Sequence, residues 1–449
     1  MQPDLIRKHA APVPRYTSYP TAPHFHAGIN AGTYREWLGA IAPGTALSLY
    51  AHIPFCDRLC WFCACNTKQT RRYQPLADYL TYLYREIATV AGAVDGRVEV
   101  GALHFGGGSP TMLAPDDMRA LNDVLRSAFK FRPDAEISVE IDPNDMDEAR
   151  FDALAEIGMT RVSLGVQDFD PRVQQAINRE QTFDQTRAVV DGARMRGVSS
   201  VNIDLLYGLP HQTRESVEAT VEQALLLNPD RIALFGYAHV PWMRKHQTMI
   251  DEAALPDALE RFSQSSRAAE ILLSCGYQAI GIDHFARPDE TMAIAHREGR
   301  LRRNFQGYTV DDLDTLIGLG ASAIGKLPQG YVQNNTATSE YQRLVSETGL
   351  GVTKGFALSE EDRMRAWVIE RLMCDFSFSK SEFARCFGAQ GTPVIEIAEK
   401  LLQEDEDGLI ASSGDRFVVT SRGRPVVRSV VAAFDAYFGT NGARHSIAV

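Results

Sequence analysis

The chain has 449 residues, of which 45% are hydrophobic and 23% charged, which suffices for about three globular domains and excludes a disordered chain. Its 46 basic and 57 acidic residues give a net charge of −11, so we expect neither a nucleic-acid partner nor an anionic-membrane surface. The N-terminus lacks a signal peptide, no apolar run reaches membrane-spanning length, and the seven cysteines are an odd number. These features predict a cytoplasmic protein whose clustered cysteines bind metal or react rather than form disulfides.

Residues 1–45 are punctuated by proline and glycine, which predicts an extended N-terminal arm with one short helix near Tyr34–Ile41. Strand-like runs then alternate with helical patterns, which is typical of βαβ units in a parallel sheet. The strand-like runs are Leu47–Ile53, Val100–Phe105, Glu136–Ile141, Arg161–Gln167, Val201–Tyr207, Arg231–His239 and Tyr277–Ile282. Six or seven such units predict an α/β fold, with a full or partial (β/α) barrel over residues 46–300.

After residue 300 this alternation stops, so we interpret residues 301–449 as a separate, mostly helical C-terminal domain. The expected helices are Ser359–Asp375, Lys380–Cys386, Pro393–Glu404 and Pro425–Tyr437, and the expected hairpin joins Leu409–Ala411 to Arg416–Thr420. Helices followed by a small hairpin resemble a winged-helix module. We expect this module to be a structural lid, and DNA binding is the alternative.

Polar residues stand at or near the ends of four strand-like runs, namely Glu140, Gln167, Asp204 and His239. Each of them alone could simply mark the end of a strand. Because the C-terminal ends of parallel barrel strands meet on one rim, the four together indicate a functional site there.

Four thiols, Cys56, Cys60, Cys63 and Cys65, lie within ten residues directly after the first predicted strand. Thiolates are the ligands that iron–sulfur clusters need, whereas structural zinc sites usually combine two separate ligand pairs. The spacing C-x3-C-x2-C at Cys56, Cys60 and Cys63 resembles that of the radical S-adenosylmethionine (SAM) superfamily. There, three thiolates hold a [4Fe–4S] cluster and leave one iron open for SAM. The spacing alone leaves open whether Cys65 is a fourth ligand, which would make a closed electron-transfer cluster.

A glycine run, Gly106–Gly108, follows the second predicted strand and continues into Ser109, Pro110 and Thr111. Glycines at this place let the backbone approach a ligand closely. The spacing does not match a dinucleotide-binding G-x-G-x-x-G loop. It resembles the run that, in radical SAM proteins, meets the methionine amino group of SAM.

Beyond these motifs the chain resembles, nearly from end to end, the oxygen-independent coproporphyrinogen III oxidases (dehydrogenases). The segments that carry the resemblance are Arg15–Thr21, Tyr50–Cys56, Ser138–Pro143, Ser163–Asp168, Asn202–Pro210, Gly236–His239, Asp283–Arg287 and Arg303–Tyr308. The resemblance implies a partial (β/α) barrel of the radical SAM type, with an N-terminal arm and a winged-helix-like C-terminal domain.

The resemblance also implies site residues and two SAM molecules bound side by side. Cys56, Cys60 and Cys63 would hold the [4Fe–4S] cluster, and Cys65 would be an additional thiol that is not a ligand. The first SAM would contact Tyr50, Gly107, Glu140 and Ile324. The second would contact Phe62, Gly108, Ser109, Gln167, Arg179, Asp204 and Ala238. Tyr50, Glu140, Phe305 and Gln306 match positions that the family needs for activity, the last two of them near the substrate.

The implied reaction is the oxidative decarboxylation of the ring A and ring B propionates of coproporphyrinogen III. A reduced cluster splits SAM, and the 5′-deoxyadenosyl radical takes a hydrogen from the propionate β-carbon. Loss of CO2 and one electron then leaves a vinyl group, and two such reactions give protoporphyrinogen IX in haem biosynthesis. The reaction needs an electron donor and an electron acceptor, which the sequence does not identify, and we expect a monomer.

Three other functions remain open from the sequence: a haem chaperone related to this family, a methyl-transferring radical SAM enzyme, and a closed-cluster electron-transfer protein. The haem chaperones differ from this chain in sequence, because they lack the N-terminal arm and the fourth cysteine that this chain has. A tetracarboxylate substrate needs local positive charge. The candidates are Arg287, Arg297, Arg300, Arg302 and Arg303, and solvated surface charge is the alternative interpretation.

Overall fold

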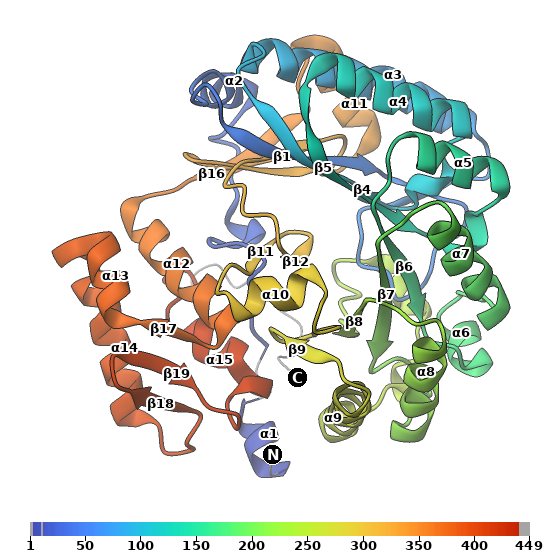
Figure 1. Ribbon diagram of the computed structural model, residues 1–449. Coiled ribbons are helices and arrows are strands. Elements are labelled where there is room, and N and C mark those ends of the chain that lie inside the picture. The colour runs from blue at the N-terminus through green and yellow to red at the C-terminus, as the bar shows by residue number, and fades with distance from the viewer. Residues whose placement is uncertain (1–2, 10–11, 440–449) are drawn as a thin grey trace.

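Six parallel strands lie side by side in chain order at the centre of the computed structural model, which describes residues 3–9 and 12–439 (Figure 1). They are β1 (Ala46–Ile53), β4 (Glu99–Gly107), β5 (Lys130–Ile141), β6 (Arg161–Gln167), β7 (Ser200–Tyr207) and β8 (Arg231–Gly236). Each pairs in parallel with the next, from β1 with β4 to β7 with β8. The predicted parallel sheet is therefore confirmed.

Further strands extend this sheet on both sides. Beyond β1 lie β13 (Leu316–Leu319), β14 (Ile324–Leu327), β15 (Gly330–Asn334) and β16 (Val352–Ala357), and beyond β8 lie β10 (His284–Ala286) and β9 (Gln278–Ile280). In the described residues the outermost strands, β16 and β9, do not pair with each other. The sheet is therefore open, and the partial barrel is confirmed.

Two predictions about this sheet differ from the structure. The run Tyr277–Ile282 was expected to be a further parallel strand, but only β9 forms there, and it pairs antiparallel with β10. The reason is a tight turn with Gly281 at positive φ, which returns the chain so that β10 inserts between β9 and β8.

The barrel was also expected to end at residue 300, whereas β13 pairs in parallel with β1. The sheet continues to residue 357. The prediction missed this part because its strands are short and apolar and lack the alternation of helix and strand that marked the earlier units.

Helices cover the outer face of the six parallel strands, as Figure 1 shows. They are α3 (Gln74–Val94), α4 (Pro115–Ala128), α5 (Glu148–Glu156), α6 (Pro171–Ala176), α7 (Phe183–Met195), α8 (Arg214–Leu226) and α9 (Ala258–Ser274). The helical spacing of Leu76, Tyr79, Leu80, Leu83 and Ile87 places all five side chains on one face of α3, where they are buried in the main core. Two shorter helices, α10 (Thr291–Arg297) and α11 (Thr338–Thr348), follow later in the chain.

The N-terminal arm connects the barrel to the C-terminal part. It contains α1 (Pro3–His9) and α2 (Ala31–Gly39), and α2 confirms the helix expected near Tyr34. Tyr16 and Tyr19 are buried in the C-terminal core, where the Tyr16 hydroxyl donates to Asp435 (3.1 Å). Further along, His26 forms a backbone bridge to Gly355, with N–O distances of 2.9 and 3.1 Å, at the outer edge of β16.

The C-terminal helical domain is present, on the other side of the molecule from α3 and α4 (Figure 1). Its elements are α12 (Glu360–Asp375), β17 (Ser377–Ser379), α13 (Lys380–Phe387), α14 (Thr392–Glu404), β18 (Ile410–Ser413), β19 (Arg416–Val419) and α15 (Val427–Ala432). The capping box of Ser359 and Asp362 and the β18–β19 hairpin are confirmed. The last helix is shorter than expected, since a 3-10 turn precedes it and it ends at Ala432. Residues 440–449 of this predicted domain lie outside the described part of the chain.

Among the helices that the structure describes, none has both the length and the apolarity needed to cross a membrane.

The buried carboxylate of Glu86, on α3, joins the extension of the sheet to the barrel. One carboxylate oxygen accepts hydrogen bonds from the Gly320 amide (2.7 Å) and the Tyr341 hydroxyl (2.8 Å). The other accepts from Asn334 Nδ2 (2.8 Å) and the Gly351 amide (3.3 Å). Glu86 therefore fixes residues from β15, α11 and two loops against α3.

Replacing Glu86 with Gln should destabilise the fold by about 2–3 kcal/mol, because in either orientation the new amide nitrogen faces a backbone amide, that of Gly320 or Gly351, which can only donate. The measurement is the free energy of unfolding in denaturant. Glu347→Gln is the matched control, since Glu347 is exposed in a surface pair with Arg343, and it should change stability by less than about 0.5 kcal/mol. Equal effects of the two substitutions would contradict this role of Glu86.

Candidate active site

The four clustered cysteines lie on a loop between two short strands, β2 (Phe55–Cys56) and β3 (Lys68–Gln69), which pair with each other. We call residues 56–67 the cluster loop. Cys60 is buried, Cys56 and Cys63 are partly buried, and Cys65 is exposed. The pairing of β2 with β3 closes the loop at its base, next to the C-terminal end of β1.

Side chains from other parts of the barrel hold the backbone of the cluster loop. Asn178 Nδ2 donates to the Leu59 carbonyl (2.9 Å), and the backbone amide of Trp61 donates to the Ile177 carbonyl (2.9 Å). Three side chains of the segment after β8 bind the following carbonyls: Gln247 Nε2 with Phe62 (2.9 Å), His246 Nε2 with Cys63 (2.6 Å) and Arg244 Nε with Ala64 (2.8 Å). These five hydrogen bonds hold the backbone of the loop between Leu59 and Ala64.

The thiols of this loop have different electrostatic surroundings. Burial raises the pKa of Cys56 to about 12 and raises that of Cys60, which accepts a hydrogen bond from Arg179 Nη1 (3.6 Å). A hydrogen bond from Cys65 lowers the pKa of Cys63 to about 7, and the Cys65 amide also donates to the Cys63 sulfur (3.3 Å). Cys65 thus acts here as a donor to Cys63.

The donor set fits an iron–sulfur cluster better than a single metal ion. In residues 3–9 and 12–439, no three Cys, His, Asp or Glu side chains converge closely enough to share one ion. A structural zinc ion needs such convergence, whereas each thiolate of a cluster binds a different iron atom. Cys56, Cys60 and Cys63 stay the predicted ligands of the cluster, with Cys65 as the additional thiol.

Two glycines of the run at the end of β4 are required by close packing. Gly107 has φ +120°, and a Cβ there would lie 2.7 Å from the His52 ring. A Cβ on Gly108 would lie 2.4 Å from the carbonyl oxygen of Phe55, directly before the first cysteine. These glycines therefore let the end of β4 pack closely against His52 and the base of the cluster loop, while their approach to a ligand stays a prediction.

Glu140 joins the ends of β4 and β5. Its carboxylate accepts a hydrogen bond from the Gly107 amide (3.0 Å) and lies 3.2 Å from His104 Nε2. Burial alone would raise the pKa of Glu140, but the hydrogen bonds from His104 and Gly107 outweigh it and hold the pKa below its usual range. The Tyr50 ring stacks on His104 with ring centres 5.7 Å apart, and its hydroxyl lies 2.9 Å from His52 Nδ1. Tyr50 and Glu140 therefore both contact the His104 ring. Because its pKa is lowered, Glu140 is ionised at neutral pH.

Arg179 is buried and reaches three groups on different segments. It pairs with Asp142 (3.0 Å) and donates to the Gly165 carbonyl and to the Cys60 sulfur. Burial alone would raise the pKa of Asp142, but Arg179 holds it below its usual range. Gln167, at the end of β6, has φ +70°, so the chain turns sharply there. Arg179 therefore links the cluster loop to the ends of β5 and β6.

Asp204, on β7, accepts hydrogen bonds from Ser163 Oγ (3.0 Å) and Asn202 Nδ2 (2.7 Å). Burial raises its pKa to about 6 despite these two bonds. Together with His104, Glu140 and Gln306, Asp204 lines a cavity of about 210 Å³ inside the barrel.

The other predicted SAM contacts are distributed along the same rim. Ser109 is buried and donates to Asp145 (2.6 Å), and Ile324 begins β14. Phe62 and Ala238 are brought together by Gln247, whose Nε2 donates to both of their carbonyl oxygens (2.9 and 3.2 Å). Sequence reasoning missed Gln247, and no motif could have revealed it, because it acts on backbone atoms.

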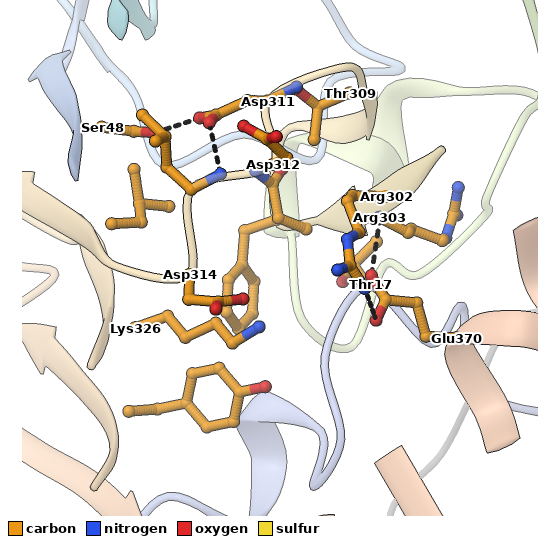
Figure 2. Close-up of a pocket in the computed structure, with 15 residues that line it drawn as sticks. Thr17, Ser48, Arg302, Arg303, Thr309, Asp311, Asp312, Asp314, Lys326 and Glu370 are labelled. Carbon is orange, nitrogen blue, oxygen red and sulfur yellow. Dashed lines mark hydrogen bonds and ion pairs between the residues drawn. The ribbon is translucent and has the colours of Figure 1, made fainter. Parts of the chain in front are cut away.

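Phe305 and Gln306 form the turn of a hairpin, β11 (Arg302–Asn304) and β12 (Gly307–Thr309), but they face different spaces. Gln306 lines the cavity inside the barrel. Phe305 packs against Phe25 and Tyr331, with ring centres 6.3 and 5.8 Å apart. It also lines a small cavity of about 70 Å³ (Figure 2). The assignment of individual contacts to two SAM molecules stays a prediction.

The arginines expected to hold substrate carboxylates mostly have partners of their own. Figure 2 shows Arg302 and Arg303 beside Glu370, and Arg302 pairs with it (3.5 Å). Three others are bound by neighbours outside the barrel cavity: Arg287 by Asn228, Arg297 by Gln278 and Arg300 by Glu298. Of the five, only Arg303 lines the large cavity of about 370 Å³ between the barrel and the C-terminal domain.

Comparison with known proteins places the chain in a family. The model of the radical SAM superfamily matches residues 50–224, and that of the HemN C-terminal domain matches residues 358–426. The oxygen-independent coproporphyrinogen III oxidase of Bradyrhizobium diazoefficiens is 49% identical over 97% of this chain and 97% of its own length. That of Paracoccus denitrificans is 47% identical over 95% and 94%.

A solved structure agrees with these relatives. The coproporphyrinogen III oxidase HemN of Escherichia coli, described as a radical SAM enzyme, superimposes with a TM-score of 0.90 at 39% identity, covering 94% of this chain and 97% of that one. Since the match extends from the arm through the barrel to the C-terminal domain, this chain belongs to the oxygen-independent coproporphyrinogen III oxidases, a family of the radical SAM superfamily.

Proposed function

We propose that this chain converts the ring A and ring B propionates of coproporphyrinogen III to vinyl groups, giving protoporphyrinogen IX. The observation that supports this most is the meeting of the three-thiol loop, the close-packed glycines and the ionised Glu140 at neighbouring strand ends. The name carried by relatives that match nearly the whole chain supports the substrate.

Members of the radical SAM superfamily use a [4Fe–4S] cluster and SAM. When bound, these groups supply the electron transfer and the 5′-deoxyadenosyl radical that removes hydrogen from the propionate. Cys56, Cys60 and Cys63 would hold the cluster, and Arg179 would offset negative charge at Cys60, to whose sulfur it donates. Glu140 is fixed by His104 and the Gly107 amide, so its carboxylate can accept from the amino group of SAM without first reorganising.

Two SAM molecules would be bound in this proposal. Tyr50, Gly107, Glu140 and Ile324 would contact the first, and Phe62, Gly108, Ser109, Gln167, Arg179, Asp204 and Ala238 would contact the second. Gln247 supports the second set by holding Phe62 and Ala238 together. Gln306 lines the cavity shared with Glu140 and Asp204, where it can position the reacting propionate. Phe305 supports the hairpin through its contacts with Phe25 and Tyr331.

The reaction further requires an electron donor and an electron acceptor. We also propose that the chain works as a cytoplasmic monomer. The N-terminal arm and C-terminal domain then close the barrel and exclude water and oxygen from the site.

The direct test is anaerobic reconstitution of the cluster, followed by addition of SAM, a reductant, coproporphyrinogen III and a cell extract as the source of an electron acceptor. We expect 5′-deoxyadenosine together with decarboxylated product. Absence of both would overturn the proposed reaction.

The cysteines should differ in their effect on the cluster. Cys56→Ser, Cys60→Ser and Cys63→Ser should each abolish most cluster iron, because three ligands are needed. Cys65→Ser should retain it, as should Cys275→Ser, the control at an exposed cysteine far from the loop in sequence. The measurement is iron and sulfide content after reconstitution. Loss of the cluster in Cys65→Ser would favour a closed four-thiolate cluster instead.

Glu140→Gln should lower SAM affinity and 5′-deoxyadenosine formation by about 10–100-fold, since a charge-assisted hydrogen bond contributes about 1.5–3 kcal/mol. Equilibrium dialysis with SAM and chromatography of the products measure the two effects. Glu156→Gln, which changes a surface partner of Arg119, is the control and should leave both unchanged. Wild-type SAM affinity in Glu140→Gln would remove this residue from the site.

The raised pKa of Asp204 gives stability a defined pH dependence. Because its folded-state pKa is about 6 and its ordinary value is 3.8, the folded state binds this proton more tightly than the unfolded state. The resulting stabilisation is complete below pH 3.8 and is lost as pH rises through about 6. Wild type loses this stabilisation as pH rises, and Asp204→Asn has none to lose. The unfolding free energy of wild type should therefore fall relative to that of Asp204→Asn by at most about 3 kcal/mol across this window. Denaturant titrations at several pH values measure it, and a difference that does not change with pH would contradict the assignment.

A further inference from the structure

A second, larger cavity of about 370 Å³ lies between the barrel and the C-terminal domain. Its walls come from the ends of β7 and β8, from α9, from the turn before β10, from the arm at Arg15 and from the C-terminal domain near Arg428. Phe235 and His284 line both this cavity and the one inside the barrel that contains Glu140 and Asp204. The two cavities are therefore neighbours on the same side of the sheet.

This cavity has an excess of positive charge, although the whole chain is acidic. Its arginines come from distant parts of the chain and are Arg15, Arg261, Arg303, Arg424 and Arg428. The acidic residues in its lining are Asp283 and Asp375, and both are already engaged. Asp283 lies 2.6 Å from His284 Nδ1 and also offsets part of the charge of Arg15 and Arg303, whereas Asp375 pairs with Arg371 (2.8 Å). Two carboxylates remain against five arginines.

Holding these arginines close together is unfavourable, because their buried like charges repel one another. Burial lowers the pKa of Arg15, Asp283 and Tyr207 partly offset this, and nearby Arg303 lowers it further. Burial likewise lowers the pKa of Arg428 to about 10, with Arg15 and Arg303 again contributing. Arg303 lies over the Tyr308 ring (4.4 Å to its centre), and its buried Nε and Nη1 atoms make no hydrogen bond to any described residue. Like charges in such surroundings are stabilised when an anion binds between them.

The remaining walls are apolar. Leu234, Phe235, Phe262, Ile282 and Phe285 line the same cavity. A ligand that matches this lining therefore has several carboxylates on a largely apolar framework. A substrate with four carboxylates reacts at one propionate at a time, so its other carboxylates must be held outside the reaction cavity.

We propose that Arg15, Arg261, Arg303 and Arg428 bind the carboxylates of the tetracarboxylate substrate that are not reacting, while the reacting propionate extends past Phe235 and His284 into the barrel. The identity of the ligand rests on the proposed function. The location of the carboxylate site rests on the cavity and its charges.

The test is a binding titration with coproporphyrin III, the stable oxidised form of the substrate, using the holoprotein with its reconstituted cluster. Arg303→Met and Arg428→Met should each raise the Kd for coproporphyrin III by about 10–100-fold, as expected for loss of a charged hydrogen bond. Arg303→Lys, which keeps the charge without the planar fork, should give an intermediate Kd. Coproporphyrin III tetramethyl ester, which lacks the charges, should bind wild type and variants equally.

Arg300→Met is the matched control, because Arg300 is exposed and pairs with Glu298 outside this cavity. It should leave the Kd unchanged, and SAM affinity should be unchanged in all variants, which also shows that they are folded. An unchanged Kd in both Arg303→Met and Arg428→Met, or an equal loss in Arg300→Met, would overturn the proposal. If the cavity variants lose binding while wild type forms no vinyl product, the carboxylate site stands and the proposed reaction fails.

Discussion

The fixed backbone of the cluster loop is the constraint on which the active site depends. The loop between β2 and β3 has no regular structure of its own beyond its two short strands, yet three of its side chains must face one cluster. Its carbonyl oxygens are held by Asn178, Arg244, His246 and Gln247, which come from two different rim segments. The positions of the three thiols relative to the rim therefore depend on these four side chains.

The same rim segments also hold the groups expected to contact SAM. Gln247 connects the cluster loop to Ala238, and Arg179 connects Cys60 to Asp142 and the Gly165 carbonyl. A shift of one strand end would therefore move a thiol and a predicted SAM contact together. This coupling explains why the site is built from neighbouring ends of parallel strands rather than from one long loop.

The sequence predicted the groups that carry chemistry better than the groups that hold them. The thiols, the glycine run and Glu140 were found because their spacing and their positions after strands reflect a chemical requirement. Asn178 and Gln247 were missed, because a side chain that binds a distant carbonyl leaves no local pattern. The continuation of the sheet through β13 to β16 was missed for a similar reason: its pairing with β1 is set by tertiary contacts, which short apolar segments do not reveal. Arg15 and Arg428 are far apart in sequence, so only the fold shows that they share a cavity.

The bridge between His26 and Gly355 has a consequence for solubility. An open barrel leaves two outer strands whose unpaired backbone groups could pair with another chain, and β16 is one of them. The arm places His26 across the middle of β16 and satisfies both backbone groups of Gly355. Besides contributing Arg15 to the arginine-lined cavity, the arm therefore shields this edge against aggregation, a risk that a closed barrel does not have.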